Sequence, residues 1–280
     1  LWGALLFPAA FLFDRWWQSN YGLAAGIWHP PQILKAVAFF AIVLGSWLLA
    51  ATWQNRPERG GAVAFAVGGG LVLTLIGVVT LTSSYPNRQH SGAFYEVACA
   101  TYPIVPVALR GARKLRWPAT AAAATYTAVI CSMVWLLPLF PAKPQVAPIY
   151  NPLDHMMPPP FPLLLIVPAL AIDALLRKMR ADRPWLQAVA AGVMFFVIFA
   201  AVQWIFAEFL LSDMADNRFF AGGGKHWPFF LKIDPLARLQ FWGAAKDELN
   251  VVSGLISIAL GILAARLGLS IAAWIRRIQR

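Results

Sequence analysis

Charged residues are scarce in this chain of 280 residues: 12% are Asp, Glu, Lys or Arg, whereas 60% are hydrophobic. A soluble globular domain carries about 25% charged and about 45–50% apolar residues. A chain with so few polar side chains cannot cover its own apolar surface, so lipid must cover it. The composition therefore excludes an ordinary soluble domain and makes the lipid bilayer the first expected partner.

Cysteine is scarce too, because Cys99 and Cys131 are the only two and both lie in apolar runs. Neither belongs to a C-x-x-C pattern, so no disulfide framework is expected and both thiols are expected to pack. The sequence has no Walker A motif, no G-x-S-x-G and no H-E-x-x-H. No His or carboxylate lies in the middle of an apolar run, which argues against an embedded bis-histidine haem and against a proton or sodium relay.

Long apolar runs are what the sequence has instead. A membrane-spanning helix needs about 20 mostly apolar residues. About eight candidate spans lie at residues 1–13, 32–54, 62–83, 93–109, 118–140, 161–176, 185–211 and 251–274. The first run is expected to be truncated, and Pro103 and Pro106 are expected to kink the fourth. These runs predict an all-α, polytopic transmembrane helix bundle, a single integral membrane domain over residues 1–280.

The connectors between the runs alternate in charge. Those on one side hold clustered Arg and Lys residues, at 56–59, 110–116, 177–183 and 276–280. The positive-inside rule makes that side cytoplasmic and places both termini there. The longest connector on the other side, residues 212–250, is then an extracytoplasmic loop, with an interfacial helix as one option at 234–245.

The net charge of +11 is spread over these short clusters. Such clusters beside apolar runs fit lipid headgroups, so nucleic acid is not expected as a partner. The expected location is a bacterial inner membrane, crossed several times.

All four histidines fall on the predicted outer side, together with several carboxylates and methionines. Imidazole, carboxylate and thioether ligands suit copper, and the first two also suit zinc or iron. The candidate metal ligands are His29, His90, Glu96, Asp154, His155 and Met156. The alternative is that Asp154 and His155 bond to loop backbone while the methionines enter the membrane interface.

Ionisable residues inside or close to apolar runs are costly in a membrane and are often functional. Glu96 and Glu208 lie at the depth of the histidines and are candidates for an outer polar pocket. The alternative for both is a salt bridge to Arg88, Arg15 or Lys35. On the other side, Asp173 and Arg177 are four residues apart, a spacing that predicts an ion pair on one helix face.

Small residues recur at three- and four-residue steps in the last run, a spacing that places them on one helix face. They are Gly254, Ser257, Gly261, Ala264 and Gly268. Small side chains let another helix approach closely. The face is therefore a candidate for docking a partner subunit, and packing within the chain is the alternative.

One short pattern is similar to a known family. Asp14-x3-Gln18, followed by His29, has the outline of the Asp-x3-His pair and second His in membrane subunits of copper-dependent methane and ammonia monooxygenases. Gln18 stands where that pattern has its first imidazole, and the similarity covers only residues 14–29. The chain is not assigned to that family.

Three functions compete on these observations. The first is a non-catalytic or accessory subunit of a larger respiratory, photosynthetic or oxygenase complex, with other membrane subunits as partners. The second is a copper-type metalloprotein, either an enzyme or a copper-handling protein, with its site at the outer face. The third is a transporter or lipid-handling protein, in which the kinked fourth run and the glycines at 68–70 would move.

Overall fold

The structure is a computed structural model. It describes residues 1–22, 29–53, 60–81, 89–111, 115–142, 155–156, 158–180, 182–215, 217–221 and 248–278. Its α-helices in these ranges are α1 (Trp2–Tyr21), α2 (Pro30–Trp53), α3 (Gly60–Leu81), α4 (Gly92–Thr101), α5 (Ile104–Ala108), α6 (Pro118–Leu136), α7 (Ile166–Lys178), α8 (Pro184–Leu210) and α10 (Val251–Ile278). Short 3-10 turns follow at η2 (Leu109–Gly111), η3 (Leu137–Leu139) and η4 (Asp213–Ala215). The described part of the chain is all-helical, as predicted.

Five of these helices are long and apolar enough to cross a membrane: α2, α3, α6, α8 and α10. Each lies on one of the predicted apolar runs, and each has the roughly 20 residues that a bilayer requires. The structure therefore supports a helical membrane protein. The number of spans and the placement of the termini in the cytoplasm stay predictions.

The other three predicted spans differ from expectation. The first run does not stop at residue 13, because α1 continues as one helix through the polar strip that ends at Tyr21. The fourth run is broken between α4 and α5 at Tyr102 and Pro103, close to the expected kink. The sixth run is helical only from Ile166, because residues 158–165 before it are not helical. A 13-residue helix is too short to cross a bilayer alone.

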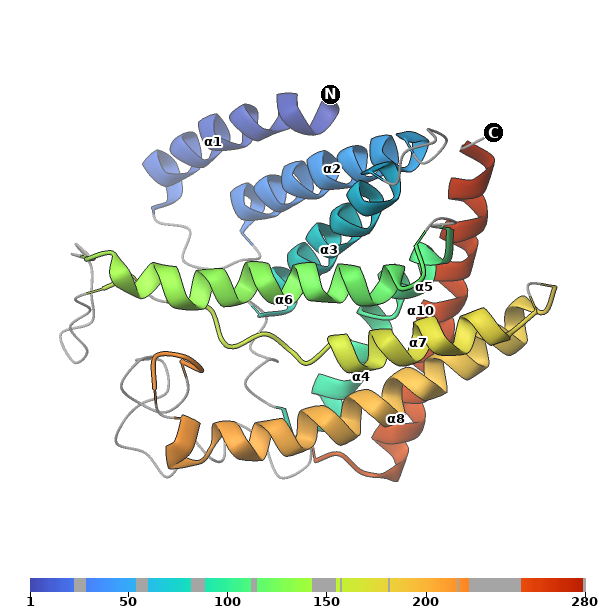
Figure 1. Cartoon of the computed structure of the whole chain (residues 1–280). Helices are drawn as coiled ribbons and strands as arrows, with labels where there is room; N and C mark the ends of the chain where they lie inside the picture. The colour runs from blue at the N-terminus through green and yellow to red at the C-terminus, as the bar shows by residue number, and fades with distance from the viewer. Residues whose placement is uncertain are drawn as a thin grey trace.

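The broken helix α4–α5 lies at the centre of the bundle. It packs against α10, α8, α6, α3 and α7, which surround it. Its side chains Tyr95, Cys99 and Tyr102 are almost completely buried. From this core the helices continue outward in the order α3, α2 and α1, so that α1 lies at the edge of the molecule (Figure 1).

The three consecutive glycines of α3 allow three neighbours to approach that helix. A methyl group added at Gly68 would meet the Trp47 ring at 2.9 Å, and one at Gly69 would meet Leu109 at 3.0 Å. At Gly70 it would meet Thr125 at 2.5 Å. Because successive helix residues point about 100° apart, the triplet accommodates α2, η2 and α6 on different sides. The triplet is thus tightly packed.

The small-residue face of α10 is occupied within the chain. The Cα of Gly192 on α8 lies 3.5 Å from a methyl group built at Gly261. At Gly268 such a group would meet the carbonyl oxygen of Ile104 at 2.5 Å, and Ser257 and Ala264 are buried. These contacts are the in-chain packing that the sequence left as the alternative to partner docking, because α8 and α5 already cover the face.

Candidate functional site

Three of the basic segments, those that hold Arg110, Met179 and Arg276, meet at one end of the bundle, and the segment at 56–59 lies outside the described residues. The guanidinium of Arg110 donates to the backbone carbonyl of Met179 at 3.2 Å and to the side-chain oxygen of Gln187. Burial and, second, the positive charge of Arg276 lower the pKa of Arg110 from its ordinary value. The ends of η2, α7 and α10 and the start of α8 are therefore close together. Grouping of this kind is what the positive-inside pattern predicts for one membrane face.

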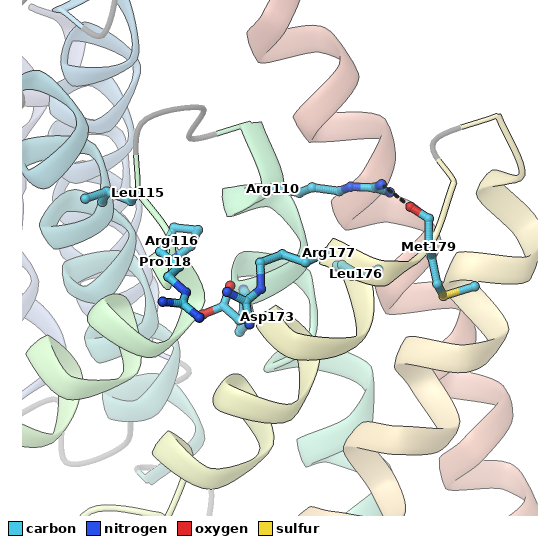
Figure 2. Close-up of a pocket in the computed structure, with 9 residues that line it drawn as sticks. Arg110, Leu115, Arg116, Pro118, Asp173, Leu176, Arg177 and Met179 are labelled. Carbon is cyan, nitrogen blue, oxygen red and sulfur yellow. Dashed lines mark hydrogen bonds between the residues drawn. The ribbon is translucent and has the colours of Figure 1, made fainter.

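A cavity of about 310 Å³ opens at this end and is called the basic pocket below (Figure 2). It lies where η2, α6 and α7 meet. It is lined by Pro106, Arg110, Leu115, Arg116, Pro118, Asp173, Leu176, Arg177 and Met179. Three guanidinium groups thus share the cavity with one carboxylate.

The charge of Arg177 acts on Asp173, as the sequence spacing predicted, but the hydrogen bonds of the carboxylate go to another helix. The two carboxylate oxygens of Asp173 accept the backbone N–H of Ala119 at 3.3 Å and of Thr120 at 2.8 Å, and also the Thr120 hydroxyl at 2.8 Å. The residue before α6, Trp117, gives no side-chain cap. The orphan N–H groups of a helix start need an acceptor, and a carboxylate there also opposes the positive end of the helix dipole. Asp173 thus caps α6 from another helix.

The two other arginines of the pocket are placed by an aromatic ring. The guanidinium carbon of Arg177 lies 3.7 Å from the ring centre of Trp117, and that of Arg116 lies 5.6 Å from it. Contacts of this kind attract a cation to the negative face of the ring. Figure 2 shows Arg116 and Arg177 converging beside Asp173, whereas Arg110 reaches toward Met179.

A second polar cluster lies toward the opposite end of the bundle. The Nε2 atom of the fully buried His90 is 3.2 Å from a carboxylate oxygen of Glu208, whose side chain is 43% exposed. The Trp204 ring meets the imidazole edge to face, with ring centres 4.3 Å apart. Glu208 therefore pairs with His90, whereas Glu96 lies half-buried on α4 outside this pair, and the outer location of the cluster stays a prediction.

Buried amides next to this cluster hold the segment before α7. Gln203 donates to the side chain of Gln89 at 2.7 Å and accepts the backbone N–H of Leu164 at 3.0 Å. The Tyr126 hydroxyl accepts the N–H of Leu163 at 3.1 Å. Backbone without helical bonds is tolerated inside a membrane protein only where other groups satisfy it. These side chains allow residues 158–165 to enter the bundle without a helix.

The candidate metal ligands do not gather in the described part of the chain. No group of three or more His, Cys, Asp or Glu side chains there is placed to hold one ion. His90 is beside Glu208, His29 directly precedes α2, and His155 forms a β-bridge with Pro141. Met156 is exposed, and Asp154 lies outside the described residues, as do His226 and residues 234–245.

The Asp14 and Gln18 pair is used to join helices. Lys35 of α2 approaches the Asp14 carboxylate to 2.5 Å, and Gln18 donates to the same oxygen at 3.1 Å. Lys35 therefore pairs with Asp14, not with either of the glutamates suggested by the sequence. Asp14 and Gln18, two residues of the pattern that is similar to a copper-ligand motif, therefore join α1 to α2.

Sequence reasoning overlooked Gln89, Gln203 and Trp117. A glutamine within a strongly apolar run was the available signal for Gln203, because a buried amide must find partners. Trp117 and Arg116 are adjacent in the chain, but only the fold brings Arg177 to the same ring.

The described residues form an all-helical bundle with five helices long and apolar enough to cross a membrane and a basic pocket at one end. Comparison with protein-family models, with curated proteins and with solved structures finds no match.

Proposed function

We propose that the chain is a non-catalytic integral subunit of a larger assembly in a bacterial inner membrane, of the respiratory, photosynthetic or oxygenase kind. The observation that carries the proposal is the one-sided packing of α1. This helix packs against α2, which connects it to α3 and the core. Large apolar side chains of α1, among them Leu5, Leu12 and Trp16, are exposed.

Lipid alone is poorly suited to contact the exposed surface of α1. Although it has 20 residues, α1 is not among the five helices that are apolar enough to cross a membrane. Its second half exposes Arg15, Gln18 and Asn20 beside Trp16. Polar side chains facing hydrocarbon are costly, whereas a neighbouring protein can offer them hydrogen bonds. A partner subunit on α1 would satisfy both kinds of side chain.

The buried polar groups favour a structural role over a catalytic one. Asp173 caps α6, Gln203 holds the segment before α7, and Asp14 joins α1 to α2. Each of these contacts joins two parts of the bundle and so stabilises it. A copper-type metal centre is the alternative, but in the described residues no three His, Cys, Asp or Glu side chains are placed to hold one ion.

The test is extraction from the native membrane in a mild detergent, followed by mass measurement of the particle that contains the chain. We expect a stoichiometric complex well above the 30.8 kDa of one chain. Replacing Leu5 and Leu12 by Trp should break the complex. The matched control replaces Leu255 and Leu263 of α10, which are similarly exposed. A stable single chain, or equal effects of both pairs, would refute the proposal.

Transport is a second candidate because of one feature, the non-helical segment 158–165 before α7. Transporters build binding sites where unwound backbone lies inside the helix bundle. Here Tyr126 and Gln203 hold the segment. Substrate-dependent flux into liposomes containing the purified chain would favour this candidate, and flux that needs no partner would exclude the first.

A further inference from the structure

We propose that the basic pocket binds the phosphate group of an anionic phospholipid. The pocket brings three guanidinium groups, those of Arg110, Arg116 and Arg177, to one cavity of about 310 Å³. Arginine binds phosphate with paired, charge-assisted hydrogen bonds. Basic pockets between membrane helices on the cytoplasmic side are suited to lipid headgroups. This inference is independent of whether the chain belongs to a larger complex.

The single carboxylate of the pocket can offset only one of the three cations. Asp173 interacts with the charge of Arg177, and both its oxygens also accept hydrogen bonds from the start of α6. In addition, the positive charge of Arg276 acts on Arg110. Positive charge therefore exceeds negative charge around the cavity, and a bound anion would relieve the repulsion.

The arginines retain donors for a ligand. Arg177 lies over the Trp117 ring, a contact that uses the flat face of its guanidinium and leaves the N–H groups at the edge. Arg116 approaches the same ring from farther away and is exposed. The ring thus holds two guanidinium groups beside the cavity without hydrogen-bonding to them, and their N–H groups can reach a phosphate.

The remaining walls favour a lipid over a free phosphate ion. Pro106 and Leu176 are buried apolar residues of the cavity, and Leu115 and Met179 are partly exposed at its side. The cavity lies at the beginning of α6, a helix that is long and apolar enough to span a membrane. The end of a span is where headgroups lie, and the apolar wall suits the glycerol and first acyl carbons.

The proposal is tested by native mass spectrometry of the detergent-solubilised full chain. It is mixed with dioleoylphosphatidylglycerol, with dioleoylphosphatidylcholine, or with the former plus inorganic phosphate in excess. We expect one phosphatidylglycerol to be retained, with at least about tenfold preference over phosphatidylcholine, since each basic residue near a lipid surface adds severalfold to binding. Inorganic phosphate should not displace it.

Two variants locate the site. Arg116→Gln with Arg177→Gln should lower retention at least about tenfold. The control, Arg183→Gln with Arg277→Gln, removes the same charge from exposed positions outside the pocket and should lower it less than about twofold. Leu115→Trp keeps every charge and fills the cavity, so it should also weaken lipid retention. If the double arginine variant does not fold, this variant tests the proposed site.

Equal losses in the arginine pair and its control would mean that surface charge alone attracts lipid, which overturns the proposal. Unchanged retention in both pocket variants would overturn it as well. Displacement by inorganic phosphate would show that the pocket recognises a free anion and not a lipid, which refutes the assignment of the source.

Discussion

A carboxylate oxygen of Asp173 accepts the backbone N–H of Thr120 across 2.8 Å and so joins the last turns of α7 to the first turn of α6. These two residues are 53 positions apart in the sequence. The contact does for α6 what an N-cap side chain does in most helices. It also determines the shape of the basic pocket, because both α6 and α7 contribute to its walls.

Replacing Asp173 by Ala should lower the free energy of unfolding by about 1–3 kcal/mol, since two helix N–H groups and a hydroxyl lose a charged acceptor. Asp173→Asn should cost less, because the amide oxygen still accepts one bond. The measurement is thermal unfolding in detergent. Asp182→Asn, at an exposed acid near the same end, is the control and should change little. Equal stability of Asp173→Ala and the parent protein would contradict the capping role.

The sequence predicted the membrane class and most helices, because apolar length is a local property. It correctly placed a break near Pro103, since proline acts on its own helix. It predicted the electrostatic interaction of Asp173 with Arg177 but not the hydrogen bonds of Asp173, because helical spacing cannot reveal competing donors on another helix. The pocket could not be predicted, because Trp117 and Arg177 meet only after α6 and α7 have packed.

The contact between α8 and α10 depends on Gly192. A methyl group there would lie 2.5 Å from the backbone nitrogen of Ile262, and backbone cannot move aside as a flexible side chain can. Gly192→Ala should therefore destabilise the protein by about 1–3 kcal/mol. Gly45→Ala on α2 is the matched control, because nothing lies within 4 Å of its added methyl group, and it should be neutral or stabilising by about 0.5–1 kcal/mol. Chemical unfolding of both variants measures the difference.

The Gln203 side chain should be required for the segment before α7. Gln203→Ala removes the acceptor of the Leu164 N–H and the partner of Gln89, at a cost of about 1–2 kcal/mol in a membrane protein. Hydrogen exchange of residues 158–165 should become faster in this variant. Ser132→Ala is the control, since that exposed hydroxyl bonds only to a carbonyl of its own helix. Unchanged exchange would show that Tyr126 alone secures the segment.

The Asp14 and Lys35 pair should couple α1 to α2. Their side chains are only 12% and 17% exposed, so solvent screening is weaker than at an open surface. A double-mutant cycle with Asp14→Asn and Lys35→Gln should give a favourable coupling free energy between the two side chains. A coupling near zero would contradict the pairing. Gln18, which also bonds to Asp14, should be left intact in every variant of the cycle.

Orientation in the membrane is tested by cysteine labelling, for which Cys99 and Cys131 are a favourable background because both are buried. Met214→Cys is at a 77% exposed position beyond α8, and Arg183→Cys is at the opposite, basic end of the same helix. A membrane-impermeant maleimide should label Met214→Cys in intact spheroplasts and Arg183→Cys only after permeabilisation, because clustered arginines favour the cytoplasm. The reverse pattern would place the basic pocket at the outer face. Since anionic phospholipid headgroups act on basic residues chiefly at the cytoplasmic leaflet, that result would also weaken the proposed lipid site.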